Sequence, residues 1–403
     1  MANSNETPRI SSLLDRFSEP ETLKMAKLGR ELRAQGIDVI DLSLGEPDFD
    51  TPEHIKAAAK KAIDDNFSHY TPVSGYPDLR EAVCTKLKRD NNLDYKPENI
   101  VASTGAKQSL ANAILATVDA GDEVIIPAPF WVTYSELVKI AGGVPVIVKT
   151  AMENNFKITP AELEASITSK SRVFLFSSPC NPSGSVYSKE ELAGLVEVFK
   201  KHTGIYIISD EIYEYINFVG AHESIAQFPE VKDRVIIING LSKGFAMTGY
   251  RLGYIAADVA VAKACEKLQG QFTSGTNSIT QKAAVVALTA DIAPSLEMTK
   301  EFARRRARVK ELIAGIPDWT YAEPDGAFYV FPRVDAYFGK SDGQQTIENA
   351  DDLCMYLLNV AHVSTVTGRA FGTPECIRLS FANSLPKIEE AYARIKNALA
   401  KLK

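Results

Sequence analysis

The segment Asn239–Tyr254, NGLSKGFAMTGYRLGY, contains two side chains that could carry out covalent chemistry. Ser242 lies within the letters GLSKG, which match G-x-S-x-G, the nucleophile elbow of serine hydrolases. Lys243 lies in the same turn, eight residues before Arg251, and a lysine amine can form a Schiff base with a carbonyl compound. The rest of the chain has to distinguish a serine nucleophile from a reactive lysine.

The serine interpretation meets only part of its requirements. A β-branched run precedes Gly240, and Asp351 and His362 follow in the order of the hydrolase triad. The elbow must start a helix, however, and Gly249 and Gly253 interrupt the residues that follow it. No HGGG-type loop for an oxyanion occurs upstream. We keep a serine hydrolase as the less favoured alternative.

The lysine interpretation requires further groups if the carbonyl compound is pyridoxal phosphate. Burial or a nearby cation must lower the amine pKa from about 10.4, and a carboxylate must face the pyridine nitrogen. Asp210 ends the apolar run IYIISD, at the edge where parallel sheets bind ligands, although it could equally cap a helix. The phosphate needs a helix N-terminus with small residues. Gly105 and Ala106 in STGAKQSL offer one, unless that segment is an ordinary turn.

The elements that must position these residues alternate along the middle of the chain. Between about residues 51 and 294, helical segments such as PEHIKAAAKKAIDD separate short apolar runs such as DEVIIPAP, RVFLFSSP and RVIIING. Runs of this kind are buried on both faces of a sheet, and helices between them imply parallel crossovers. We therefore predict a large α/β domain over residues 51–294.

The two ends of the chain differ from this pattern. Residues 1–50 contain one helical segment, TLKMAKLGRELRAQG, and residues 295–403 contain charged helices followed by strands such as GAFYVFP and CIRLSFA. A chain of 403 residues also exceeds what one hydrophobic core usually supports. We predict a smaller α+β domain formed by residues 1–50 together with residues 295–403.

Composition argues against several classes of function. The formal charge of −6 offers no attraction for nucleic acid, and the basic run RRRAR at 304–308 is expected to be the solvated face of a helix. No apolar stretch approaches about 18 residues and the N-terminus has no signal core, so we expect a cytoplasmic protein without a membrane partner. The five scattered cysteines and five histidines show no ligand spacing, so we expect reduced thiols and no metal.

Seven motifs follow one another in a recognisable order. They are SLGEPDFDTP, HYTPVSGYPDLREAV, STGAKQSL, SPCNPSG, SDEIYE, NGLSKGFAMTGYRLGY and CIRLSFA. From about residue 20 to residue 400 the chain thereby resembles the class I aminotransferases, most of all the bacterial aspartate/prephenate branch. The resemblance implies pyridoxal 5′-phosphate as cofactor and fold type I, with a mostly parallel seven-stranded sheet in the large domain. It also implies a homodimer with shared active sites.

The resemblance assigns a role to each residue of the cofactor site. Lys243 would carry the cofactor and, once released by substrate, move the proton at the substrate Cα as general acid and base. Asp210 would pair with the pyridine nitrogen, and Trp131 would stack on the ring. Asn181 and Tyr213 would hydrogen-bond the 3′ oxygen of the ring and favour its ionised form. The phosphate would be held by Gly105, Ala106, Ser242, Arg251 and Tyr70 of the partner subunit, and Lys107 is also expected among the cofactor-binding residues.

The substrate site is implied in the same way. Arg378 in CIRLSFA would bind the α-carboxylate with two parallel hydrogen bonds, assisted by the backbone N–H of Gly45. Trp131 and Asn181 would line the substrate site. In the branch that the chain resembles, a lysine at the position of Lys107 helps to bind the distal carboxylate of aspartate or glutamate. Lys107 could instead merely lie in the first turn of its helix. We predict ping-pong transfer of the amino group from L-aspartate to 2-oxoglutarate, giving oxaloacetate and L-glutamate.

Departures from the family pattern keep other substrates open. The N-terminal SEPETLKMAK replaces the usual Pro-Ser-Ala-Thr pattern, which often supplies hydroxyls to the distal group, and Thr367 stands where proline is typical. Asn-Pro-Ser-Gly replaces Asn-Pro-Thr-Gly and keeps the hydroxyl. The alternatives are an aminotransferase for aromatic amino acids or prephenate, then a carbon–sulfur lyase, and a non-catalytic module that binds pyridoxal phosphate.

Overall fold

The computed structural model describes residues 9–403, and its main element is a seven-stranded sheet in the order β2-β8-β7-β6-β5-β3-β4. Within this sheet β8 is antiparallel to both of its neighbours, whereas the strands from β7 to β4 pair in parallel. The predicted mostly parallel sheet is therefore confirmed. Its strands are β2 Ile100–Ser103, β3 Glu123–Ala128, β4 Val144–Lys149, β5 Ser171–Ser177, β6 Tyr206–Asp210, β7 Val235–Gly240 and β8 Gly253–Ala256.

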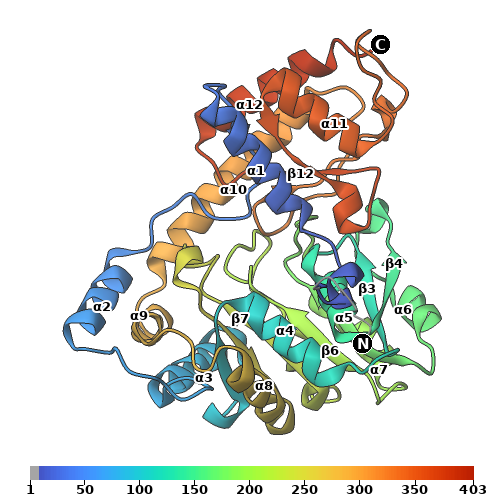
Figure 1. Cartoon of the computed structure of the whole chain (residues 1–403). Helices are drawn as coiled ribbons and strands as arrows, with labels where there is room; N and C mark the ends of the chain where they lie inside the picture. The colour runs from blue at the N-terminus through green and yellow to red at the C-terminus, as the bar shows by residue number, and fades with distance from the viewer. Residues whose placement is uncertain (1–8) are drawn as a thin grey trace, which may run out of the picture.

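Helices cover both faces of the large sheet, because successive side chains of a strand point to opposite faces. On β5, Phe174 and Phe176 belong to one core and Val173 and Leu175 to the other. The first core includes residues of α3 Pro77–Asn91, α6 Pro160–Ser166, α7 Lys189–Phe199 and α9 Ser278–Thr289, with α2 Glu53–Asp64 packed on α9. The second includes residues of α4 Ala106–Thr117, α5 Thr133–Ala141 and α8 Val259–Phe272 (Figure 1).

A second group of elements comes from both ends of the chain and shares its own core. Figure 1 shows the N-terminal α1 beside the C-terminal helices and strands, and α1 contacts β10 and β11. β1 pairs with β10, and β9, β12 and β11 form a three-stranded antiparallel sheet. These elements are α1 Glu21–Ala34, β1 Ile40–Asp41, α10 Ala293–Ala314, β9 Tyr329–Val330, α11 Ala350–Tyr356, β10 Val363–Ser364, β11 Val366–Thr367, β12 Ile377–Ser380 and α12 Leu385–Leu399.

Helix α10 joins the two groups of elements. It runs without a break through residue 294, so the predicted boundary between residues 294 and 295 lies inside this helix. The division into residues 51–294 and residues 1–50 with 295–403 stays a prediction. No helix in the described part of the chain is both long and apolar enough to cross a membrane.

The basic run at 304–308 lies on α10, as predicted, and its side chains form ion pairs. The Arg304 Nε lies 2.7 Å from a carboxylate oxygen of Glu301 on the exposed side of the helix. Arg305 differs, because it is only 5% exposed and its guanidinium lies 2.6 Å from the carboxylate of Asp48. The prediction of a wholly solvated run is therefore wrong for Arg305, which ties α10 to the loop that follows β1.

Candidate active site

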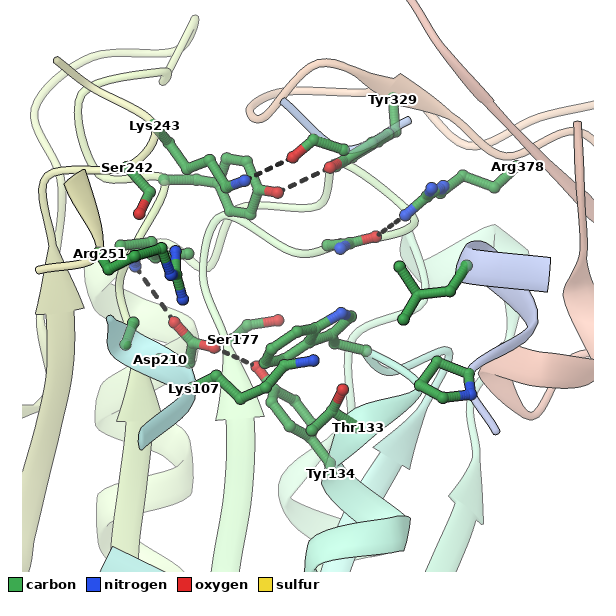
Figure 2. Close-up of a pocket in the computed structure, with 18 residues that line it drawn as sticks. Lys107, Thr133, Tyr134, Ser177, Asp210, Ser242, Lys243, Arg251, Tyr329 and Arg378 are labelled. Atoms are coloured by element: carbon green, nitrogen blue, oxygen red, sulfur yellow. Dashed lines mark hydrogen bonds between the residues drawn. The ribbon is translucent and has the colours of Figure 1, made fainter. Parts of the chain in front are cut away.

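One pocket collects almost all of the predicted site residues at the carboxyl edge of the large sheet (Figure 2). It encloses about 270 Å³, and this edge is where open α/β sheets bind their ligands. Gly105 adjoins the pocket, whereas Tyr70 does not line it and is 98% exposed. The predicted residues in its wall are Gly45, Ala106, Lys107, Trp131, Asn181, Asp210, Tyr213, Ser242, Lys243, Arg251 and Arg378.

Asp210 is a buried carboxylate at the end of β6. Its Oδ2 accepts a hydrogen bond of 2.7 Å from the Tyr134 hydroxyl, and its Oδ1 accepts one of 3.3 Å from the Ile212 N–H. Burial raises the Asp210 pKa to about 6, and the Tyr134 hydrogen bond opposes that rise. No helix starts directly after it, so the alternative of a helix cap is wrong. A protonated nitrogen facing this carboxylate would relieve its cost of burial.

Lys243 lies in the turn after β7, and its amine points into the pocket (Figure 2). The amine donates a hydrogen bond to the carbonyl oxygen of Gly45. Burial lowers the Lys243 pKa to about 8, with Glu46 raising it and the nearby Arg378 lowering it further. An amine in this range is available as a nucleophile near neutral pH, as Schiff-base chemistry requires.

The start of helix α4 has the features of a phosphate site. Gly105 is its N-cap residue, with φ of +85°, and no side chain caps the helix. The first N–H groups of a helix have no partner within the helix and attract anions. A side chain at Gly105 would collide with the guanidinium of Arg251, so glycine allows this cation to approach the helix. Ser242 lines the pocket near the same guanidinium.

Arg378 is a buried cation with donor capacity to spare. It is 2% exposed, and its Nη1 donates to the Asn181 side-chain oxygen at 2.9 Å while its Nη2 donates to the Ser43 carbonyl at 2.5 Å. Its Nε is buried and has no hydrogen-bond partner among the described residues. Burial lowers the Arg378 pKa. Arg378 has no ion-pair partner within residues 9–403, and such a buried guanidinium fits a ligand carboxylate.

Lys107 lines the pocket from the first turn of α4. Its amine lies 5.0 Å from the centre of the Trp131 ring, which suits a cation–π contact. Burial lowers the Lys107 pKa, and the neighbouring Arg251 contributes to the same effect. Pro20 and Leu23, from the start of α1, line the same pocket. Lys107 therefore adds a cation to a partly apolar wall.

Sequence reasoning missed two tyrosines of the site. Tyr134 follows Trp131 by three residues, and this helical spacing was a signal that it faces the same side. Tyr329 comes from the two-residue strand β9, and its hydroxyl lies 2.7 Å from that of Tyr213. No motif marked Tyr329, because only the pairing of β9 with β12 brings it beside Arg378.

The structure does not assemble a hydrolase triad. Asp351 forms an ion pair of 2.6 Å with Arg369, and the His362 ring lies next to the Leu358 carbonyl. Neither Asp351 nor His362 lines the pocket that contains Ser242. The serine-hydrolase alternative is therefore wrong, because a triad requires its base within hydrogen-bond reach of the serine.

A buried ionic cluster lies behind the segment that carries Asp210. Glu211 forms an ion pair of 3.1 Å with His222, and Glu214 pairs with Lys86 on α3. Lys86 is 0% exposed and donates a second hydrogen bond, of 2.7 Å, to Asn91. Burying a lysine is costly unless it is paired, so this cluster fixes the chain immediately after β6.

Comparison with known proteins gives concordant matches over nearly the whole chain. Residues 37–395 match the family model described as aminotransferase class I and II. An aspartate/prephenate aminotransferase from Nitrosomonas europaea is 42% identical, covering 97% of this chain and 100% of the relative. A bifunctional aspartate aminotransferase and glutamate/aspartate-prephenate aminotransferase from Petunia hybrida is 44% identical, covering 98% of this chain and 83% of the relative.

Two solved structures have the same fold. The aspartate aminotransferase from Rhizobium meliloti superposes with a TM-score of 0.95 at 39% identity, covering 98% of this chain and all of that chain. The aspartate aminotransferase from Thermus thermophilus with maleate gives a TM-score of 0.91 at 35% identity, covering 97% of this chain and all of that chain.

Proposed function

Because the chain belongs to the class I and II aminotransferases, we propose that it transfers the amino group of L-aspartate to 2-oxoglutarate with pyridoxal 5′-phosphate as cofactor. The products are oxaloacetate and L-glutamate, formed in two half-reactions of a ping-pong cycle. The observation that carries this proposal is one pocket in which Lys243 lies near Asp210 on one side and Arg378 on the other.

The residues of the pocket fit the cofactor. When bound, pyridoxal phosphate supplies an aldehyde for the lysine and a ring that absorbs electrons. Asp210 keeps the ring nitrogen protonated, because its buried carboxylate gains a counter-charge. Trp131 would stack on the ring, and Asn181 and Tyr213 would donate to the ring oxygen; all three residues line the pocket. The start of α4 would hold the phosphate with its free N–H groups at Gly105 and Ala106, together with Ser242 and Arg251.

The substrate is bound through its two ends and reacts between them. Arg378 would bind the α-carboxylate with its buried guanidinium, assisted by the backbone N–H of Gly45, which lines the same pocket. Lys243 would remove the Cα proton of the amino donor in the first half-reaction and deliver a proton to the Cα of the new amino acid in the second. Burial lowers the Lys243 pKa toward neutral pH, and a catalytic acid–base works best near the operating pH.

Lys107 is the feature that favours a dicarboxylate. Its partly buried amine lies at the pocket wall away from Arg378 (Figure 2) and can neutralise a second carboxylate. The Thermus relative was solved with maleate, which is itself a dicarboxylate. Aspartate is also the substrate in the names of the Nitrosomonas and Petunia relatives.

Prephenate or an aromatic amino acid is the second candidate substrate. In the segment that departs from the family pattern, Pro20 and Leu23 line the pocket, and Glu21 is directed to Arg369 at 3.5 Å. The start of α1 therefore offers apolar surface to the substrate. The names of the Nitrosomonas and Petunia relatives include prephenate.

A panel of amino donors assayed with 2-oxoglutarate tests the substrate. Aspartate is expected to give the highest kcat/KM. Lys107→Ala is expected to lower that value about 10- to 100-fold, the loss of one charged hydrogen bond, with alanine and phenylalanine little changed. Lys60→Ala, at an exposed position of α2, is the matched control. Phenylalanine or alanine outrunning aspartate tenfold would overturn the aspartate proposal, and a yellow protein inert to every donor would indicate a binding module.

We further propose a homodimer in which each pocket is completed by Tyr70 of the partner subunit. In the described chain Tyr70 is 98% exposed and lies outside the pocket, although its segment belongs to the family motifs. A sedimentation mass of one chain would contradict this proposal. We also propose that the enzyme works in the cytoplasm, which fits five scattered cysteines without a disulfide framework; fractionation of cells tests it.

A further inference from the structure

We propose that Tyr329 is a positioning residue that couples the substrate-carboxylate site at Arg378 to the cofactor oxygen site at Tyr213. The inference rests on the proposed function, because the roles of Arg378 and Tyr213 come from it. Tyr329 touches both residues and is fully buried, with 0% of its surface exposed. No sequence motif marks it.

The contacts of Tyr329 place it between two parts of the pocket. Its hydroxyl lies 2.7 Å from that of Tyr213, as the dashed line in Figure 2 marks. The guanidinium carbon of Arg378 lies 4.4 Å from the centre of its ring. A side chain at Gly45 would also collide with the Tyr329 hydroxyl, so glycine lets this loop approach it. One tyrosine therefore contacts three residues of the proposed site.

The position of Tyr329 is set by the small sheet. Tyr329 on β9 pairs with Ser380 on β12, two residues beyond Arg378 on the same strand. Its ring also packs against Phe328, with centroids 4.8 Å apart. Because β9 and β12 are paired strands of one sheet, their register places the Tyr329 ring against the Arg378 guanidinium. Tyr213 lies three residues after the end of β6 in the large sheet, so the hydroxyl pair connects the two groups of elements.

The hydroxyl of Tyr329 acts on Tyr213, and its ring acts on Arg378. Either hydroxyl of this pair can be the donor. In the arrangement we infer for the cofactor-loaded enzyme, the Tyr329 hydroxyl donates to the Tyr213 oxygen, which leaves the Tyr213 hydrogen for the cofactor oxygen. Hydrogen bonds in such a chain strengthen one another, so the ionised form of the cofactor oxygen gains stability. The ring face attracts the guanidinium of Arg378. It therefore holds that cation in place where burial has removed its water.

Two substitutions separate these contributions in the cofactor-loaded enzyme. Tyr329→Phe removes the hydroxyl and keeps the ring. The midpoint of the pH titration of cofactor absorbance is expected to rise by about 0.5 pH units, because the lost stabilisation of the ionised oxygen is a fraction of the free energy of one hydrogen bond. The Kd for maleate, a dicarboxylate without an amino group, is expected to stay within about twofold. Tyr329→Leu removes the ring as well, and the Kd for maleate is expected to rise about 5- to 30-fold.

Tyr356→Phe is the matched control, because Tyr356 is also fully buried and donates to the Ala398 carbonyl at 3.1 Å, outside the pocket. It loses a comparable hydrogen bond and is expected to leave both the midpoint and the Kd unchanged. In a Tyr213→Phe background, Tyr329→Phe is expected to cause no further rise of the midpoint, because the chain of hydrogen bonds is already broken. Additive effects would overturn the proposal.

The outcomes separate this inference from the proposed function. If aspartate fails to bleach the cofactor absorbance of the unsubstituted enzyme, the proposed function fails. If the unsubstituted enzyme responds to aspartate but Tyr329→Phe titrates like it, the coupling fails alone. The coupling also fails if Tyr356→Phe shifts the midpoint as much as Tyr329→Phe, since the effect would then come from lost stability.

Discussion

Replacing Asp210 with asparagine is expected to stabilise the cofactor-free protein at neutral pH. Burial raises the pKa of the Asp210 carboxyl from its ordinary value of 3.8 to about 6. The folded state therefore binds a proton more tightly than the unfolded state, and the free energy of unfolding falls as pH rises from about 4 to 6. Above that range the buried carboxylate lowers the free energy of unfolding by about 3 kcal/mol, because the pKa differs by about two pH units and each unit corresponds to about 1.36 kcal/mol.

Urea unfolding at several pH values measures this cost. Asparagine keeps the shape of Asp210 and an acceptor for the Tyr134 hydroxyl, 2.7 Å away, but it cannot ionise. The variant and the unsubstituted protein are expected to differ little near pH 4. By pH 7.5 the variant is expected to be more stable by up to about 3 kcal/mol. Asp64→Asn, at an exposed position of α2, gives the baseline.

Pyridoxal phosphate is expected to reverse this order, because a protonated ring nitrogen would offset the charge of Asp210, whereas asparagine carries no charge to pair with it. The variant should then bind the cofactor at least about tenfold more weakly, a loss of about 1.4 kcal/mol or more. A stability difference that is flat across pH, or a variant that is the less stable at pH 7.5 without cofactor, would refute the reasoning from burial.

Two further substitutions test the frame of the site. Gly105→Ala places a side chain against Arg251 at a backbone φ of +85°. It is expected to raise the Kd for pyridoxal phosphate about tenfold or more. An unchanged Kd in a cofactor titration would contradict the phosphate site. Lys86→Met leaves Glu214 buried without its cation and is expected to cost about 3–5 kcal/mol in urea unfolding, largely recovered by adding Glu214→Leu. A loss below about 1 kcal/mol would show that the pair matters little.

The large sheet was predictable because most of its strands are buried on both faces and therefore mainly apolar, with the edge strand β4 as the partly exposed exception. One strand was not predicted: β8 is four residues long, Gly253–Ala256, and lies in the segment whose letters also fit a nucleophile elbow. Its antiparallel insertion between β2 and β7 depends on long-range pairing. Local patterns do not encode that pairing, which is why the surrounding strands were predicted and β8 was not.

The site was predictable to the extent that its residues stand in ordered motifs. Lys243 and Asp210 come from the ends of long apolar runs, so their shared edge follows from the parallel sheet. Tyr329 comes from a strand of two residues, and its neighbours are set by tertiary pairing alone. The burial of Arg305 depends on a contact with Asp48, which lies 257 residues away in the chain, and helix periodicity cannot supply such a contact.

The five residues that begin at Asp210 divide their work between two directions. Asp210 and Tyr213 point into the pocket, while Glu211 and Glu214 are held from behind by His222 and Lys86. Two side chains of this short stretch thus face the pocket, and two others anchor its backbone. Substitutions of Asp210 or Tyr213 are therefore expected to leave the backbone of this stretch in place. Replacing Glu211 or Glu214 alone would shift that backbone, so its effect on the pocket could not be separated from an effect on the fold.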